Sequence, residues 1–321
     1  MSAVWGLVDD RTGHAAQVLG VISKLGLPYQ PKRLEYNMLG RLLPPGMQRS
    51  SLLGLDHQRS APISEPWPKL VIASGRRTLP ALRAIKKASP STVTVYLMWP
   101  GSTSGIDLIA APEHDNPPTA PNVIRTLAPL HAVTSETLTA ARQEWAPQFQ
   151  HLPRPWVAVC LGGNTKSGEY SAKDWRTVIT AAQELAGYGS LLVTTSRRTP
   201  ADAVTQADSV ISKPHLLHRW DVDKDNPYLG MLGAADSIVV TGDSLSMCAE
   251  ACVTGKPVYI YAPHHILPRK HRKLHQTLYI RNMAKPLDQA HGMPWKPAMG
   301  LDEAAMVARE IRTRFPSILA A

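Results

Sequence analysis

Cysteine is scarce in this chain of 321 residues, which carries only Cys160, Cys248 and Cys252. Three thiols cannot build the disulfide framework on which small secreted domains depend. Cys248 and Cys252 lie four residues apart beside Leu245 and Ala249, so they fit the apolar stripe by which a helix faces a core. The cysteine content excludes a disulfide scaffold and indicates a reducing compartment such as the cytoplasm.

Long hydrophobic runs are absent as well. The opening residues, MSAVWGLVDDRTG, contain neither the basic start nor the apolar stretch of a secretory signal. No segment reaches the roughly 18 to 20 apolar residues of a membrane-spanning helix. We therefore expect a cytoplasmic protein that is either soluble or bound peripherally to the inner face of the cytoplasmic membrane.

Several common catalytic and cofactor motifs are missing from the sequence. It contains no G-x-G-x-x-G dinucleotide fingerprint, no P-loop, no G-x-S-x-G nucleophile elbow and no H-E-x-x-H zinc motif. His271 and His275 have the spacing of two helical metal ligands, but their basic neighbours repel a cation. We therefore expect no metal site and no bound cofactor.

Positive charge, by contrast, is plentiful, with a net charge of +10. Basic residues are densest in the segment from His264 to Lys285, which contains no acidic residue. Such a segment suits a phosphate-bearing ligand or an anionic membrane surface, while a solvated basic helix is the simpler alternative. No zinc finger, RNP motif or alternation of aromatic and basic residues is present, so nucleic acid is the least favoured partner.

Short runs rich in Val and Ile alternate with helical patterns along the chain. This alternation predicts an α/β fold with parallel sheets that are covered on both faces. Strands are expected at 4–10, 69–75, 92–100, 106–114, 156–163, 190–196, 237–243 and 257–263, and helices at 12–26, 80–89, 171–189, 199–208 and 301–315.

Prolines cluster at HLPRPW, from His151 to Trp156, and a fresh series of strands and helices begins directly afterwards. We interpret this cluster as a hinge between two domains. The predicted organisation is an N-terminal domain at 1–152, a C-terminal domain at 153–300, and a final helix at 301–321 that packs back across the linker.

Polar turns follow the predicted strands, and the carboxyl ends of parallel strands share one edge of a sheet. Glycine permits close backbone approach, helix N-termini attract anions, and arginine matches phosphate oxygens. These turns predict a phosphorylated ligand held between two domains. In the second half the candidate residues are Gly162, Gly163, Asn164, Ser196, Arg197, Arg198, Thr241, Gly242, Asp243, Ser244 and Ser246. Arg76 and Arg77 in the first half are candidates for binding a phosphate.

One acid, Glu250, stands in the small apolar segment LSMCAEACV. On a helix that begins near Ser244, Glu250 lies away from the apolar stripe and could accept two hydrogen bonds from a ribose diol. The alternative is structural, because Glu250 could cap a neighbouring backbone or form an ion pair with Lys256.

The segment TGDSLSMCAEACVTGKPVYIY resembles the donor-site segment of GT-B glycosyltransferases, in which an E-A-x-x-x-G-K-P pattern follows a Gly/Ser turn. The resemblance implies that Glu250 binds the ribose of a nucleotide sugar, and that Asp243, Ser244 and Ser246 line the donor pocket. It also implies that no metal is required, because GT-B enzymes generally lack the D-x-D metal motif.

Almost the whole chain resembles the mitochondrial fission ELM family, which has many bacterial members. The matching stretches include LVDDRTGHAAQVLG, LVIASGRRTLPALRAIKKAS, VAVCLGGNTK and NPYLGMLGAADSIVVTGDSLSMCAEACVTGKPVYIY. This resemblance implies a GT-B-like fold, with two Rossmann-like domains whose parallel sheets face a central cleft. It implies a glycosyltransferase that moves a sugar from a nucleotide sugar to an envelope glycoconjugate or a lipid-linked acceptor, which would be a glycolipid or a saccharide.

For such a transfer, we expect the diphosphate to meet the N–H groups of Gly162, Gly163 and Asn164. An inverting reaction also needs a base for the acceptor hydroxyl, whereas a retaining one does not. The candidates are Asp10, His14 and Glu113, and their neighbours Asp9, His114 and Asp115 are further alternatives. Asp10 is favoured because it ends the first strand, although it could equally cap the following helix.

Two other functions stay open at this point. The first is epimerisation of a nucleotide sugar on the same fold, with acid and base groups from the PEHD loop. The second is a non-catalytic adaptor that binds a membrane through His264 to Lys285, as the family name suggests.

Overall fold

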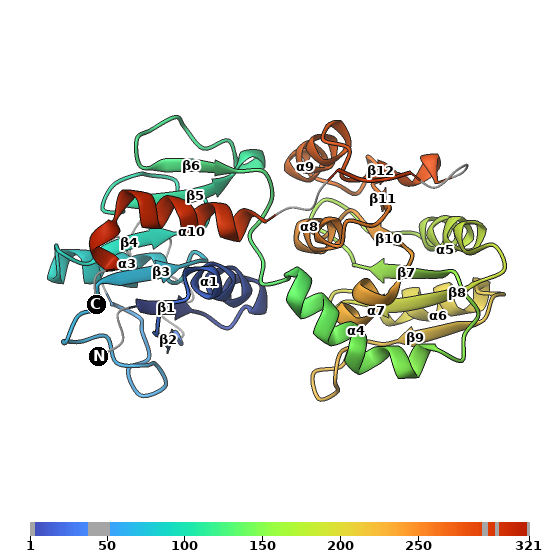
Figure 1. Cartoon of the computed structure of the whole chain (residues 1–321), viewed down its shortest axis with the longest axis horizontal. Coiled ribbons are helices and arrows are strands. Elements are labelled where there is room, and N and C mark those ends of the chain that lie inside the picture. Colours follow the sequence, from blue (N-terminus) through green and yellow to red (C-terminus); the bar gives the residue numbers. More distant parts are fainter. Residues whose placement is uncertain (1–3, 38–51, 291–294, 299–301, 320–321) are drawn as a thin grey trace. The chain divides into compact units, whose positions relative to one another are not determined.

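The protein consists of two compact α/β units. The first combines Met1–Ala132 with Asp302–Ala321, and the second is Val133–Leu301. The computed structural model describes residues 4–37, 52–290, 295–298 and 302–319. Within this part of the chain, each unit contains a six-stranded sheet whose paired strands all run parallel (Figure 1). The predicted α/β class with parallel sheets is confirmed.

The sheet of the first unit has the strand order β2-β1-β3-β4-β5-β6. Its elements are β1 (Val4–Val8), α1 (Thr12–Leu25), β2 (Tyr29–Arg33), β3 (Leu70–Ala73), α3 (Leu79–Ala88), β4 (Val93–Tyr96), β5 (Leu108–Pro112), η1 (Glu113–Asp115), β6 (Val123–Thr126), α10 (Glu303–Arg314) and η3 (Pro316–Ile318).

Apolar side chains cover both faces of this sheet. β3 is buried along its whole length, because parallel strands beneath helices have no solvent face. Helix α1 ends at Gly26, whose φ of 63° is a left-handed conformation that glycine adopts without strain. Helix α10 returns from the far end of the chain, packs against α1 and buries Val307 and Ile311 in the same core.

The sheet of the second unit has the strand order β12-β11-β10-β7-β8-β9. Its elements are α4 (Ser135–Phe149), β7 (Trp156–Leu161), α5 (Ala172–Ala186), β8 (Ser190–Thr195), α6 (Ala201–Val210), β9 (His215–His218), α7 (Tyr228–Ala234), β10 (Ser237–Thr241), α8 (Leu245–Val253), β11 (Val258–Tyr261), α9 (Arg269–Ile280), β12 (Lys285–Pro286) and η2 (Leu287–Gln289).

Helix α4 explains why the units divide after Ala132, before the predicted boundary at residue 152. It packs closely against α7, as Figure 1 also shows. A Cβ atom on Gly230 would lie 2.5 Å from the Trp145 side chain, and one on Gly233 would lie 2.5 Å from the Leu138 carbonyl oxygen. The absence of side chains at these two glycines therefore permits the close packing of α4 on α7, and this packing makes α4 part of the second unit.

None of the helices in the described segments combines the length and the apolar character that crossing a bilayer requires.

Candidate functional site

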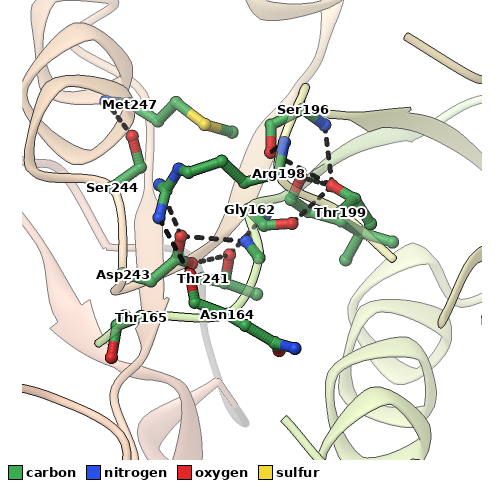
Figure 2. Close-up of polar contacts among 12 residues, drawn as sticks. Gly162, Asn164, Thr165, Ser196, Arg198, Thr199, Thr241, Asp243, Ser244 and Met247 are labelled. Atoms are coloured by element: carbon green, nitrogen blue, oxygen red, sulfur yellow. Dashed lines mark hydrogen bonds and ion pairs between the residues drawn. The ribbon is translucent and has the colours of Figure 1, made fainter. Parts of the chain in front are cut away.

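The turns that follow three neighbouring strands of the second unit, β7, β8 and β10, meet at the carboxyl edge of its sheet (Figure 2). β10 and β8 both pair with β7, so residues far apart in sequence come together there. The cluster contains Gly162, Asn164, Ser196, Arg198, Thr241, Asp243 and Ser244 from the predicted set. Ligand sites of open α/β sheets occur at this kind of edge.

Asp243 is the centre of the cluster, and its side chain is fully buried. One carboxylate oxygen accepts a hydrogen bond from the Gly163 amide at 2.9 Å and an ion-pair hydrogen bond from Arg198 at 2.8 Å. The other oxygen accepts from the Thr241 hydroxyl at 2.7 Å and the Tyr170 hydroxyl at 3.2 Å. Asp243 therefore joins the three turns, which is a structural role beyond the pocket-lining role expected for it.

Glycine is required at two positions of the first turn. A Cβ atom on Gly162 would lie 2.2 Å from the Asp243 carboxylate, and one on Gly163 would lie 2.0 Å from the Arg198 carbonyl oxygen. The Gly162 amide donates to the Thr241 hydroxyl at 2.7 Å, while the Gly163 amide donates to Asp243. Both amides are thus engaged within the protein, which corrects the expectation that they meet a diphosphate.

Two arginines of the β8 turn stand beside this cluster. Arg197 and Arg198 are exposed, and Arg198 also donates to the Asn164 carbonyl oxygen at 3.3 Å. The Thr199 hydroxyl donates to the Leu161 carbonyl oxygen at 2.9 Å and accepts from the Ser196 amide at 2.8 Å, which fixes the turn. The turn therefore presents two guanidinium groups on a rigid backbone.

Helix α8 begins at the same edge of the sheet. The Ser244 hydroxyl caps it by accepting from the Met247 amide at 3.4 Å, and Ser246 lies in its first turn. The N-terminus of a helix carries partial positive charge and favours an anion. Together with Arg197 and Arg198, it makes this edge electropositive.

His271 and His275 on α9 do not act as a pair. The Nε2–H group of His271 donates to the Asp243 carbonyl oxygen at 3.1 Å, and burial and the nearby Lys270 charge lower the pKa of His271. His275 lies instead with its Nε2 atom 3.9 Å from the Cys248 sulfur and against Gly242. The two rings thus support the backbone of the β10 turn from α9.

Glu250 lies on α8 and is partly buried. Its Oε2 atom accepts a hydrogen bond from the Tyr228 hydroxyl of α7 at 2.7 Å. Burial raises the pKa of Glu250 to about 7, although the Tyr228 hydrogen bond opposes this shift. Lys256 does not pair with Glu250, because its Nζ donates to the Leu232 and Gly233 carbonyl oxygens at 2.8 and 2.7 Å. The ion-pair alternative for Glu250 is therefore wrong.

In the first unit, the partly buried His14 and the buried Asp9 form a dyad at the carboxyl edge of the sheet. The Nδ1 atom of His14 lies 3.1 and 3.0 Å from the two carboxylate oxygens of Asp9. Because a carboxylate only accepts, this nitrogen carries the proton and Nε2 keeps a lone pair. Gly75 makes room for the ring, since a Cβ atom there would lie 2.2 Å from Nδ1.

Asp10 is the neighbour of this dyad but has a different partner. Its carboxylate lies 2.6 Å from the Arg77 guanidinium, and the Tyr36 hydroxyl donates to the Arg77 carbonyl oxygen. Burial alone would raise the pKa of Asp10, but the hydrogen bond and charge of Arg77 outweigh it, so the pKa is lowered. Arg76 points into solvent as an exposed residue. A carboxylate with a lowered pKa is a weak base, which makes His14 the better candidate.

Glu113 stands apart from these groups. It lies in η1 after β5, and β3 and β4 separate β5 from β1 in the sheet. Its negative charge acts on Glu303 of α10. The pKa of Glu303 is raised mainly by burial and further by the charge of Glu113. The structure therefore brings Asp10, His14 and Arg77 to one place and Glu113 to another.

Tyr170, Thr199 and Tyr228 take part in the site although the sequence did not point to them. Tyr170 donates to Asp243, Thr199 holds the β8 turn, and Tyr228 holds Glu250. Of these three residues, only Thr199 could have been identified from the sequence, because it lies in the polar segment TTSRRT at the end of a strand. The two tyrosines lie in segments whose spacing gives no hint of their partners.

Sequence comparison finds relatives over almost the whole chain. A family model described as Mitochondrial fission ELM1 matches residues 12–315. The mitochondrial fission protein ELM1 of Arabidopsis thaliana is 28% identical over 277 residues, which are 77% of this chain and 65% of that protein. The chain thus spans just under two thirds of that relative. The uncharacterized protein RP120 of Rickettsia prowazekii is 27% identical, with 96% of this chain and 97% of that protein covered.

Solved structures with the same fold are distant in sequence. The UDP-GlcNAc 2-epimerase of Methanocaldococcus jannaschii matches with a TM-score of 0.52 and 12% identity over 97% of this chain and 99% of that one. S. aureus MnaA with UDP matches with a TM-score of 0.53 and 11% identity, covering 100% and 98%. Acinetobacter baumannii MurG matches with a TM-score of 0.50 and 11% identity, covering 99% and 92%. The likeness shows a GT-B-like fold.

Proposed function

This chain belongs to the mitochondrial fission ELM1 family, and we propose that it is a glycosyltransferase that uses a nucleotide-sugar donor. The observation that carries the proposal is the electropositive edge of the second unit. There, Arg197, Arg198 and the N-terminus of α8 follow neighbouring parallel strands, and Glu250 lies on that same helix. The acceptor is a glycolipid or saccharide of the cell envelope.

The diphosphate of the donor binds to the cations of this edge. The exposed Arg197 guanidinium and a helix N-terminus supply positive charge to a leaving diphosphate as the glycosidic bond breaks, and Arg198, whose charge is paired with Asp243, adds N–H donors. Arg198 is already held in place by Asp243 and the Asn164 carbonyl oxygen. A cation that is positioned before the ligand arrives loses little conformational freedom on binding.

The ribose of the donor binds to Glu250. A carboxylate offers two oxygens with about four acceptor sites, and Tyr228 occupies one site on Oε2. The remaining sites suit two adjacent hydroxyl groups.

The acceptor hydroxyl is deprotonated by His14 of the first unit. Asp9 holds the imidazole in the tautomer with Nδ1–H, so that Nε2 takes the proton. When the ring becomes an imidazolium, the Asp9 carboxylate at 3.0 Å stabilises the new charge. Arg77 lies next to the dyad and can bind an acceptor phosphate when the phosphate replaces Asp10 as its ion-pair partner.

Calorimetry with UDP-, GDP- and CMP-sugars, followed by product analysis, tests the proposal. Binding together with transfer to an added acceptor supports it. Binding with conversion of the donor to an isomer would instead identify a nucleotide-sugar epimerase, a possibility suggested by the fold shared with the UDP-GlcNAc 2-epimerase of M. jannaschii. Failure to bind any nucleotide sugar would reject both enzymatic functions.

The pH dependence of nucleotide binding tests the role of Glu250. Because burial raises its pKa to about 7, the carboxyl is protonated below this pH and ionised above it. The ionised form accepts from both ribose hydroxyls, so affinity is expected to rise as the pH increases through about 7. Glu250→Gln is expected to lose about 1 to 3 kcal/mol at pH 8.5.

The Gln variant also serves as the control, because every other titrating group of the protein or the ligand contributes to both profiles. A difference between the two pH profiles near neutrality isolates Glu250. Parallel profiles with equal affinities, measured by calorimetry on folded protein, would remove Glu250 from the site.

A membrane-binding adaptor is the second candidate function, and helix α9 is the observation that favours it. Arg269, Lys270 and Lys273 are exposed on this helix, and Ile280 at its end is 84% exposed. Cations beside an exposed aliphatic residue suit an anionic lipid surface. The two functions are compatible, because a transferase that acts on a lipid-linked acceptor also has to reach a membrane.

Vesicle sedimentation tests the membrane surface. The double variant Lys270→Ala/Lys273→Ala is expected to lose about 2 kcal/mol of binding to vesicles rich in phosphatidylglycerol, since each cation contributes about 1 kcal/mol. The matched control is Lys87→Ala/Lys173→Ala, which removes exposed lysines from α3 and α5. Equal binding of both variants, or binding to neutral phosphatidylcholine vesicles, would contradict an electrostatic surface on α9.

A further inference from the structure

Trp67 separates two cavities at the amino edge of the first unit's sheet, which is the edge opposite to the one that holds His14. Trp67 lines a cavity of about 330 Å³ together with Trp5, Gln30 and Ser64. It also lines a cavity of about 560 Å³ together with Ser89, Ser91 and Ser317. Both volumes lie in the range of small-molecule sites, which is about 300 to 1,000 Å³.

The place of these cavities in the fold distinguishes them from the site that holds His14. Trp5 is near the start of β1, Lys69 directly precedes β3, and Val93 begins β4. Because the strands are parallel, these residues mark the amino edge of the sheet, whereas Asp9 and Asp10 follow the carboxyl end of β1. A ligand in the two cavities therefore contacts none of the groups of the His14 dyad.

The indole of Trp67 is held in a fixed orientation. Its Nε1–H group donates to the Glu65 carboxylate at 3.2 Å, and its ring packs against Trp5 with a centroid distance of 6.1 Å. Trp5 is fixed in turn by Lys32, whose Nζ lies 4.2 Å from the centre of the ring and donates to the Pro62 carbonyl oxygen at 2.9 Å. A ring that is ordered before the ligand arrives is a preorganised surface for stacking.

The chemistry of the lining suits a neutral, hydroxyl-rich ligand. Gln30, Ser64, Ser91 and Ser317 are exposed neutral side chains that can both donate and accept hydrogen bonds. Lys32 is engaged with Trp5 and Pro62, and the Glu65 carboxylate is engaged with Trp67. Lys69 is an exposed cation of the larger cavity and the Glu65 carboxylate lies in the same lining, so the net charge that a phosphate would meet here is small. A pyranose ring, by contrast, presents C–H groups to an aromatic face and hydroxyl groups to its surroundings.

We propose that the two cavities beside Trp67 bind a neutral oligosaccharide, with one sugar unit in each cavity and the indole as the stacking platform for one of the two units. The site goes beyond the proposed transfer reaction, because it lies at the other edge of the sheet from His14. Through this site the first unit can bind a glycan chain independently of the residues that carry out the sugar transfer.

Frontal affinity chromatography on immobilised full-length protein tests the proposal, with chitotetraose, cellotetraose and maltotetraose as probes. At least one probe is expected to bind with a Kd of about 1 mM. Trp67→Ala is expected to weaken this binding about tenfold, while Trp67→Phe, which keeps an aromatic face, loses less. The matched control is Tyr188→Ala, which removes a 98% exposed aromatic residue from the second unit and is expected to change nothing.

A second variant covers the case in which Trp67→Ala fails to fold. Ser91→Arg changes an exposed residue of the larger cavity and blocks it without touching the indole, so it is also expected to weaken binding about tenfold. Absence of binding by all three probes, or binding that survives both variants, would overturn the proposal. Trp67-dependent capture of a proline-rich peptide in place of the glycans would overturn it too. Calorimetry with nucleotide sugars tests the donor site independently of this experiment, so a negative result for one site does not contradict the proposal for the other.

Discussion

His14→Gln is expected to lower the rate of sugar transfer by about a hundredfold to ten-thousandfold, the usual contribution of a positioned general base. Glutamine can still accept and donate hydrogen bonds, but it cannot take a proton from the acceptor hydroxyl. The affinity for the donor nucleotide is expected to stay unchanged, because Glu250 and Arg198 belong to the other unit. The measurement is kcat from a transfer assay, with donor affinity from calorimetry beside it.

Two further variants separate His14 from its neighbours. Asp9→Asn removes the carboxylate that accepts from Nδ1 and fixes the tautomer, so it is expected to lower kcat as well. Asp10→Asn is expected to cost much less, since Arg77 lowers the pKa of Asp10 and makes it a poor base. A large loss in Asp10→Asn with a small one in His14→Gln would reverse the assignment and restore Asp10 as the base.

Asp243→Ala is expected to destabilise the second unit by about 3 to 5 kcal/mol, the cost of breaking a buried charged network. The carboxylate is fully buried and accepts from Gly163, Thr241, Tyr170 and Arg198. Alanine would remove the acceptor of the Gly163 amide and of the Thr241 and Tyr170 hydroxyls in the buried part of the site, whereas Arg198 is exposed and keeps its hydrogen bond to Asn164. Urea unfolding followed by circular dichroism gives the change in free energy of unfolding.

The conservative variant and a surface control sharpen this measurement. Asp243→Asn keeps the shape and one acceptor oxygen but loses the charge opposite Arg198, so a loss of about 1 to 3 kcal/mol is expected. Asp225→Ala removes an exposed aspartate from the same unit and is expected to have little effect. If Asp243→Ala behaves like this control, the buried network does not hold the turns together.

The sequence predicts the central strands well and the edge strands poorly. β3 reads LVIA and is buried on both faces, so its apolar run is visible without any structure. β2 reads YQPKR, is largely exposed at the edge of its sheet and contains a proline, so nothing in its composition marks a strand. β12 has only two residues, which is too short for any periodicity. The missing information is the pairing partner, which composition does not encode.

The site was predictable as a set of turns but not as a network. The glycine, serine and arginine residues after β7, β8 and β10 follow from the rule that parallel strands end at one edge. The partners of Asp243 do not, because Gly163 and Arg198 lie 80 and 45 residues away along the chain. In the same way, the Tyr228–Glu250 hydrogen bond joins two helices that flank β10 in sequence. Such contacts depend on three-dimensional distance, so spacing alone could assign Asp243 only to the pocket wall.

Helix α10 has a consequence for biosynthesis. Val307 and Ile311 complete a core that β1 and α1 begin some three hundred residues earlier, so that core can close only after the ribosome has synthesised α10. The second unit is continuous and emerges in full before α10 does. Domains generally fold in the order in which they are synthesised, but here the unit whose synthesis begins first is the one whose folding is completed last.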